Sequence, residues 1–274
     1  MALFECAAKL FGRAEEESGA SVTSAGPFLS FDHVSIAFDG RTVLDDVSFE
    51  VNRGETLCIL GRSGVGKSVA LRLLMGFLKP DSGSIRVEDA EIDKMDEDGL
   101  REIRKKVTMV FQNGALFDSL SVRENIAFPL RERGGLGEDE ILAKVDQLIA
   151  MVGVEGSADA LPSSLATGHK RAVAIARALA ASPEIVLYDE PTTMVDPIIA
   201  RRLGDLIERL KQQFGLTSIV VTHDMRFAER LADKILFLAA GKAHYFGPLD
   251  GFVSSRDTII RQFLLLDAYR LPTT

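Results

Sequence analysis

The residues with the most specific chemistry stand together in one loop-forming segment. It reads Gly61-Arg62-Ser63-Gly64-Val65-Gly66-Lys67-Ser68, a complete G-x-x-x-x-G-K-[ST] pattern. Glycines in this pattern let backbone N–H groups close around phosphate oxygens, and the N-terminus of the following helix adds a favourable partial charge. Lys67 would neutralise the β and γ phosphates, and the Ser68 hydroxyl would ligate Mg²⁺. The segment therefore predicts a nucleotide site.

A pair of acidic residues follows a second apolar run, Ile185-Val186-Leu187-Tyr188. Carboxylates at a strand end are common and mostly solvated, but beside a phosphate loop they have a specific use. We expect Asp189 near the metal, holding Mg²⁺ through water. We expect Glu190 near the γ-phosphate, where it would polarise the attacking water.

Three single residues complete the candidate site. Gln112 follows the apolar run 107–111 and could reach the metal from a strand end. His223 follows the run 219–222, where a neutral imidazole could hydrogen-bond the γ-phosphate, although a histidine in such a place is more often structural. Phe38 could stack under a base ring, although core packing is the more common use of such a residue.

The elements that must position these residues alternate between strand and helix. Continuous apolar runs at 56–60, 185–188 and 218–222 indicate strands buried on both faces. Segments 29–31, 34–38 and 47–51 indicate an additional β-rich region, and helical periodicity dominates from 95 to 207, with breaks near Pro129, Gly134-Gly135 and Pro162. This order predicts an α/β fold with a parallel sheet and a ligand at the carboxyl ends of its strands.

Composition excludes several classes of protein. The chain has 274 residues, 46% of them hydrophobic, and a formal net charge of -8. A protein that coats nucleic acid is usually basic, so we expect no nucleic-acid partner. No apolar stretch approaches the roughly 20 residues that cross a bilayer. The two cysteines, Cys6 and Cys58, have no companions at ligand spacing, which favours a reducing cytosol.

The order of these motifs resembles the ATP-binding subunit of ABC transporters, from Phe28 to about Pro248. The resemblance implies ATP and Mg²⁺ as cofactors and a P-loop NTPase fold of the ABC ATPase type: a RecA-like parallel-sheet core with an antiparallel β subdomain and a helical subdomain. It also implies a head-to-tail dimer that buries two ATP molecules, with Asp196 in the loop that communicates between the sites. We therefore expect a leader at 1–27, the ATPase domain at 28–250 with its helical subdomain at about 113–180, and a helical tail at 251–274.

Several segments resemble one branch, the Mla/Mce-type lipid-transport ATPases. They are 111–120, Glu124-Asn125, 128–132, Arg62 with Val65, 196–198 and the ending 261–264. This resemblance implies a hydrolysing ATPase pair under an integral permease at the cytoplasmic face of the inner membrane, moving phospholipid or another hydrophobic substrate. Mce-type substrate-binding and small regulatory subunits would be further partners.

The signature region departs from the family pattern L-S-G-G-[QM]. This chain has Leu165-Ala166-Thr167-Gly168-His169. In the family the serine donates its hydroxyl to the partner's γ-phosphate, a bond that Ala166 cannot make, and Thr167 adds a β-branched side chain. Losing a hydrogen bond to a charged group costs about 1.5–3 kcal/mol, so we expect slow hydrolysis with ATP binding retained. The Gly168 N–H could still serve, and Thr167 could supply a substitute hydroxyl.

The tail and the assembly leave alternatives open. Residues 258–269 carry enough apolar side chains to dock, either on their own subunit or on the twin subunit. The dimer could be homomeric or heteromeric.

Function leaves alternatives as well: the motor could serve an importer for a different cargo, such as a polar amino acid or a metal. It could also be a degenerate subunit that hydrolyses slowly, or a soluble ABC ATPase of DNA repair or translation, which the single acidic module disfavours. We expect the permease to contact Gln112 and residues 113–125.

Overall fold

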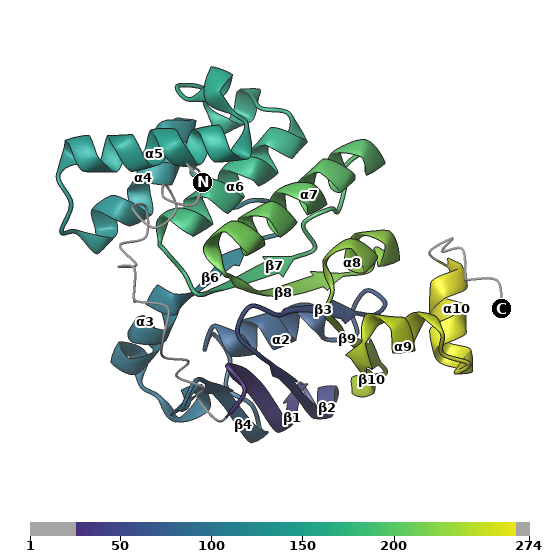
Figure 1. Ribbon diagram of the computed structural model, residues 1–274. Coiled ribbons are helices and arrows are strands. Elements are labelled where there is room, and N and C mark those ends of the chain that lie inside the picture. Colours follow the sequence, from purple (N-terminus) through teal and green to yellow (C-terminus); the bar gives the residue numbers. More distant parts are fainter. Residues whose placement is uncertain (1–25, 267–274) are drawn as a thin grey trace, which may run out of the picture.

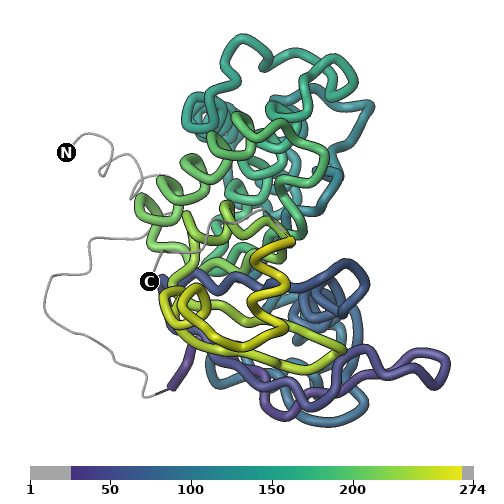
Figure 2. Tube along the Cα trace, turned by 90° about the vertical axis from the view of Figure 1, so that its right-hand side faces the viewer, coloured from purple at the N-terminus to yellow at the C-terminus, as the bar shows by residue number. Residues whose placement is uncertain are grey.

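The computed structural model describes residues 26–266 (Figure 1). The expected leader lies outside these residues, apart from Gly26 and Pro27, and so does the end of the expected tail. The described chain forms two sheets, of strand order β10-β9-β3-β8-β7-β6 and β2-β1-β4-β5, with helices on both sides of the larger sheet. The helical subdomain and the smaller sheet lie at opposite ends of the molecule (Figure 2).

The larger sheet carries the parallel strands that the apolar runs predict. Its bounds are β3 Thr56–Leu60, β6 Val107–Val110, β7 Ile185–Asp189, β8 Thr217–Thr222, β9 Lys234–Ala239 and β10 Lys242–Pro248. The first five are parallel, and β10 pairs antiparallel with β9 at one edge. Leu57 and Ile59 belong to one apolar core and Cys58 and Leu60 to another, which explains an uninterrupted apolar strand.

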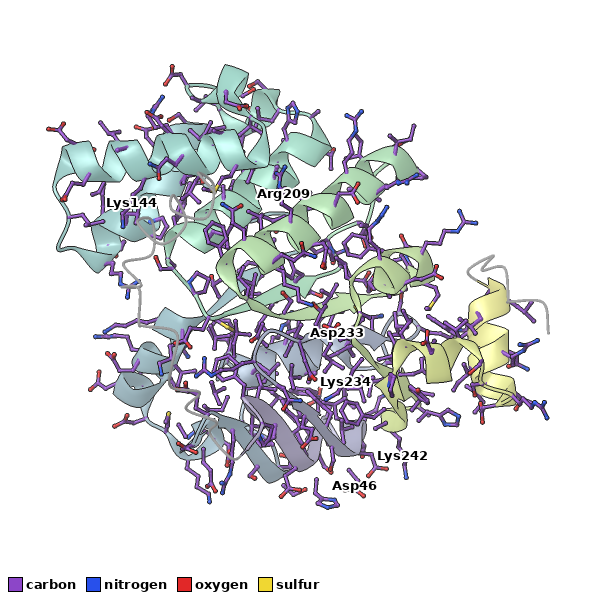
Figure 3. All side chains as sticks on the ribbon, in the orientation of Figure 1. Asp46, Lys144, Arg209, Asp233, Lys234 and Lys242 are labelled. Atoms are coloured by element: carbon purple, nitrogen blue, oxygen red, sulfur yellow. The ribbon has the colours of Figure 1, made fainter. Side chains whose placement is uncertain are left out.

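Polar contacts with residues at the start of β9 hold the first residue of β3 in place. The Asp233 carboxylate, just before β9, accepts a hydrogen bond from the Thr56 backbone N–H at 2.8 Å and one from Lys211 Nζ at 2.8 Å. Lys234, next to Asp233, is the first residue of β9 (Figure 3). Its Nζ lies 3.0 Å from a Glu55 carboxylate oxygen. These bonds anchor the strand whose opposite end leads into the phosphate loop.

The smaller sheet is antiparallel, with β1 Leu29–Phe38, β2 Arg41–Val51, β4 Ser82–Val87 and β5 Ala90–Glu91. The segments 29–31 and 34–38 of the predicted β-rich region form one strand, β1, which also includes the polar pair between them. Its pairing with β2 shifts register between Phe31 and Val34, where His33 has φ 52°. A bulge thus absorbs the polar pair and lets the strand continue.

Helices cover both faces of the larger sheet. α2 (Lys67–Leu74) lies between the two sheets, and α7 (Pro197–Phe214) and α8 (Met225–Leu231) cover the other face (Figure 1). A short 3-10 turn (Ile92–Lys94) and α3 (Glu97–Lys106) connect β5 to β6. The phosphate loop therefore connects the larger sheet to the helix that lies between the two sheets.

The helical subdomain consists of α4, α5 and α6. Their bounds are Val122–Arg133, Glu138–Val152 and Thr167–Ala180, with 3-10 turns at Glu155–Ser157 and Pro162–Ser164. A capping box of Ser121 and Glu124 starts α4. The expected break near Pro129 is wrong, because α4 continues through that proline.

The tail packs on its own chain as α9 (Leu249–Val253) and α10 (Thr258–Leu266). The Phe263 ring lies 5.0 Å from the Phe237 ring of β9 and 6.4 Å from the Phe252 ring of α9, measured between centroids. This is the first of the two expected docking modes. Ile259, Leu265 and Leu266 remain exposed, so contact with a twin subunit stays a prediction. Between residues 26 and 266, no helix is long and apolar enough to cross a membrane.

Candidate nucleotide-binding site

The phosphate loop joins the end of β3 to the start of α2. Gly64 and Gly66 have φ of 79° and 109°, a region that side chains disfavour. A Cβ on Gly66 would stand 2.7 Å from Leu44 Cδ2, so a larger residue would collide with the smaller sheet. A Cβ on Gly64 would meet nothing within 4 Å, so this part of the loop faces open space. The loop backbone can therefore approach a phosphate closely.

Lys67 is only 6% exposed, and its ammonium group is surrounded by oxygens. Nζ donates hydrogen bonds to the carbonyl of Gly61 at 2.8 Å and of Arg62 at 3.2 Å. It also lies 3.2 Å from Glu190 Oε1. A buried cation held beside open loop backbone suits a polyanion such as a nucleotide phosphate.

Ser68 and Asp189 meet as the metal prediction requires. Ser68 Oγ donates a hydrogen bond to Asp189 Oδ1 at 2.9 Å. Burial raises the pKa of the Asp189 carboxyl above its usual range, and the Ser68 hydrogen bond opposes that shift. Oxygen donors of this kind suit Mg²⁺, which is usually held by one or two carboxylates plus substrate phosphates. Residues 26–266 hold no group of three His, Cys, Asp or Glu side chains that could form a metal cage, and Mg²⁺ bound in this way needs none.

Glu190 lies at the centre of a polar network. His223 Nδ1 lies 2.8 Å from Glu190 Oε2, and Thr193 Oγ1 donates a hydrogen bond to the same oxygen at 3.4 Å. The Glu190 backbone has φ 46°, and its N–H donates to the carbonyl of Val221 on the neighbouring strand at 2.9 Å. A carboxylate that is held in place by three neighbours is a suitable general base.

Of these groups, Lys67, Ser68, Glu190, Thr193 and His223 line one cavity of about 330 Å³. It lies at the carboxyl ends of β3, β8, β7 and β6, which are successive neighbours in the sheet. The lining residues that the sequence predicts are Ser63, Gly64, Gly66, Lys67, Ser68, Gln112, Glu190 and His223. The other lining residues, Val43, Val69 and Thr193, were not predicted. Gly61, Arg62 and Val65 contribute to the loop but do not line the cavity.

Three further predicted residues, Asp189, Phe38 and Asp196, lie outside the cavity lining. Asp189 is bonded to Ser68, which does line the cavity. Phe38 is 41% exposed at the end of β1, so its stacking on a base stays a prediction. Asp196 forms the N-cap of α7, where its carboxylate accepts a hydrogen bond from the Ile198 N–H at 2.8 Å. That bond gives Asp196 a structural use, and communication between two sites stays a prediction.

The signature region also lies apart from this cavity, at the start of α6. Ala166 is the N-cap and has no side-chain hydrogen bond, and Thr167 is the first helical residue. A Cβ on Gly168 would stand 2.6 Å from Ile199 Cγ2 of α7. Close packing of α6 on α7 therefore requires glycine at 168.

The fold and the site define a P-loop ATPase with an ABC-type cassette. The ABC transporter family model matches residues 44–193. The methionine import ATP-binding protein MetN of Brucella abortus is 36% identical over 242 residues, which are 88% of this chain and 65% of that protein. MetN of Halalkalibacterium halodurans is also 36% identical, over 86% of this chain and 71% of the relative. The chain thus spans about two thirds of the length of these curated relatives.

Two solved structures have the same fold. CbiO1 of Clostridium perfringens, part of the ABC transporter complex cbiONQ, is 30% identical with a TM-score of 0.77, covering 87% of this chain and 95% of CbiO1. The dimeric cassette MJ0796 bound to ADP and Pi is 30% identical with a TM-score of 0.74, covering 81% and 98%. The chain belongs to the ABC transporter family. Its ABC ATPase fold and its ligands, ATP and Mg²⁺, are as the resemblance implies.

The comparisons confirm the family but not the predicted branch. The relatives reported above are methionine import proteins, not Mla/Mce-type lipid transporters. They favour the alternative, an importer with a different cargo, over the lipid assignment.

Proposed function

We propose that this protein is the ATP-binding and hydrolysing subunit of an ABC transporter. It acts as a dimer under an integral permease, at the cytoplasmic face of the inner membrane. The observation that carries this proposal is the meeting of Lys67, the Ser68–Asp189 pair and the Glu190–His223 pair at one edge of the sheet. Lys67 can bind phosphate, the Ser68–Asp189 pair can bind the metal, and the Glu190–His223 pair can activate water, all at the same cavity.

In this proposal the chain's own residues divide the chemistry. Lys67 and the loop N–H groups bind the phosphates, and Ser68, Asp189 and Gln112 hold Mg²⁺, which neutralises phosphate charge when bound. Lys67 exchanges its contact with Glu190 for the phosphates. Glu190 is then free to accept a proton from water, oriented by His223 and Thr193.

The signature belongs to the partner's site in this arrangement. Ala166 removes the hydroxyl that would contact the partner's γ-phosphate, and α6 offers the N–H groups of its first turn instead. Hydrolysis by a homodimer is therefore slow. In a heterodimer, the partner's complete signature would serve this chain's ATP, and only the partner's site would be weakened.

Two cargo classes have support, and the first is favoured. A small polar solute is supported by the relatives, which include methionine import proteins. A phospholipid or similar hydrophobic substrate is supported by segments 111–120 and 128–132, which resemble the lipid-transport branch. In the second case Mce-type and small regulatory subunits would join the complex.

The activity is tested by steady-state ATP hydrolysis with Mg²⁺, with Lys67→Ala as the blank. Lys67→Ala loses the buried cation, so hydrolysis must fall to background. Wild-type activity no higher than that blank, both for the chain alone and for the complex purified from membranes, would contradict the proposal.

The cargo is tested on the same membrane complex. Stimulation of hydrolysis by methionine or a related amino acid supports the importer. Copurifying phospholipid that also stimulates hydrolysis supports the lipid transporter instead.

A further inference from the structure

Another cavity, of about 470 Å³, lies between the helical subdomain and α7. We call it the α7 groove, and its lining comes from residues 150–153 at the end of α5, 168–172 of α6 and 199–209 of α7. Among the described residues it shares none with the lining of the nucleotide cavity. Pockets that hold small organic molecules usually have volumes of about 300–1,000 Å³, so the α7 groove is large enough for a ligand.

The floor of the α7 groove is apolar. Four residues that also belong to the hydrophobic core form it: Val152, Ala172, Leu203 and Leu206. Each of them is between 4% and 9% exposed, so packed side chains close the floor and still present apolar atoms to the groove. Because apolar surface gains stability when apolar atoms cover it, the floor favours a ligand with an apolar body.

The rim of the α7 groove carries two arginines. Arg202 is exposed and forms no hydrogen bond or ion pair within the described part of the chain. Arg209 (Figure 3) lies two turns later on α7 and donates a hydrogen bond to the carbonyl of Met151 at 2.5 Å. Among the described lining residues, Asp205 has the one carboxylate, and it is ion-paired with Arg230 of α8 at 3.1 Å. The rim therefore favours an anionic group.

The α7 groove connects the signature region to the end of α5. Gly168 and His169 of the signature line it on the side of α6. On the other side, Arg209 supplies a cation to the end of α5, whose last turn has no basic residue of its own. A Cβ on Gly153, the C-cap of α5, would meet nothing within 4 Å, so the groove is open at this end. A ligand can therefore enter beside Gly153 and contact Arg209.

We propose that the α7 groove binds a small amphipathic anion, a molecule with an apolar body and one anionic head group. The apolar body covers Leu203 and Leu206, and the head group pairs with Arg202 and Arg209 at the rim. The bound molecule then contacts α5, α6 and α7 together and holds the signature helix against α7. This binding needs neither nucleotide nor hydrolysis, so it is tested separately from the proposed function.

The binding test uses the full chain without nucleotide, with decanoate below its critical micelle concentration as the probe. Isothermal titration calorimetry should show saturable binding that weakens as the salt concentration rises, because salt screens an exposed ion pair. Hexanoate has the same head group and a shorter body, so it should bind at least about tenfold more weakly. No saturable binding of decanoate, or equal affinity for the two acids, would overturn the inference.

A photoreactive analogue then locates the binding site on the wild-type chain. Decanoic acid that carries a diazirine on its alkyl chain is irradiated with the protein, and the labelled peptides are identified by mass spectrometry. We expect label in 150–153 or 199–209, and an excess of decanoate should remove it. Label confined to other segments, or label that decanoate does not reduce, contradicts the assignment to the α7 groove.

Charge variants test the pairing with the rim. Arg202→Gln should weaken decanoate binding by about three- to fivefold, as loss of an exposed ion pair requires. Arg201→Gln removes the neighbouring exposed cation of α7, which does not line the groove, and should have no effect. Decanol has the same apolar body without the charge, so Arg202→Gln should leave its binding unchanged. Equal losses of decanoate binding in the two variants, or an equal loss of decanol binding in Arg202→Gln, would contradict the pairing.

A second copy of this chain could instead cover the apolar floor, and fluorescence distinguishes the two occupants. The chain contains no tryptophan, so Ala150→Trp places a single indole in the groove lining. Ala143→Trp, at an exposed position of α5 outside the lining, is the matched control. Without decanoate, the emission of both variants should be independent of protein concentration. A change with concentration in Ala150→Trp alone would assign the groove to a second copy and overturn the inference.

Hydrolysis separates this inference from the proposed function. ATP hydrolysis above the Lys67→Ala blank without decanoate binding would reject only the α7 groove as a ligand site. Decanoate binding at the α7 groove without hydrolysis above that blank, in the chain and in its membrane complex, would reject only the proposed function.

Discussion

Replacing Gly168 by alanine tests the close packing of the signature helix on α7. The added Cβ would stand 2.6 Å from Ile199 Cγ2, well inside van der Waals contact. Overpacking of this kind lowers the free energy of unfolding by about 1–3 kcal/mol. The higher helix propensity of alanine offsets up to about 1 kcal/mol of that loss. We therefore expect a net loss of up to about 3 kcal/mol.

Chemical denaturation measures this loss, and a second substitution assigns its cause. Ile199→Ala removes the colliding Cγ2, so in that background Gly168→Ala should cost nothing or stabilise the protein. The double-mutant cycle should give a coupling of at least about 1 kcal/mol. Thr167→Ala, one residue earlier, is the control for changes at the helix start. A Gly168→Ala loss that is the same with Ile199 and with Ala at 199 would refute the reasoning.

Four more predictions concern the metal site, the signature and the tail. Asp189→Asn should raise the melting temperature at neutral pH while abolishing Mg²⁺-dependent hydrolysis. Because the pKa of Asp189 is raised in the folded protein, its ionised carboxylate destabilises the fold at neutral pH. The gain in melting temperature from Asp189→Asn should therefore shrink as the pH falls toward 3.8, the ordinary pKa of aspartate. A gain that does not change with pH would contradict the raised pKa. Ala166→Ser should speed hydrolysis by about ten- to a hundredfold through the restored hydrogen bond. Thr167→Gly should slow it if the threonine hydroxyl is a substitute, and a faster variant would exclude that role. Truncation after Arg256 should destabilise the monomer, measured by thermal unfolding, because Phe263 packs on Phe237; unchanged unfolding with lost dimerisation would support docking on a twin subunit instead.

Local patterns predict the core of the site because each piece is a strand followed directly by its functional residue. One rule predicts where these functional residues lie: the carboxyl ends of parallel strands meet at one edge of the sheet. It applies to the loop after 56–60, to the acidic pair after 185–188 and to His223 after 219–222. The strand order, which places β3, β8, β7 and β6 side by side, then brings the residues together.

Contacts between distant segments escape this kind of prediction. Val43 lines the cavity because β2 passes beside Gly66, where its carbonyl lies 3.0 Å from a Cβ position. Nothing in the residues around 43 signals that approach. The same holds for Gly168 against Ile199 and for the Lys67–Glu190 pair, which depend on how helices and loops meet in three dimensions.

Predictions from local sequence also fail where tertiary packing holds a residue with low helix propensity inside a helix. Pro129 stays within α4 although proline usually ends a helix, since that helix is packed against α5 and α6. This error concerns an element boundary, and it displaces no residue of the nucleotide cavity.

The most direct test of the central claim is a comparison of ATP binding and hydrolysis in Glu190→Gln. Glutamine keeps the shape of the side chain but cannot accept a proton, so binding of radiolabelled ATP should remain within a few-fold of wild type. Single-turnover hydrolysis should fall by about 10²–10⁴-fold, as loss of a general base requires. Hydrolysis by Glu190→Gln at the wild-type rate would contradict the account.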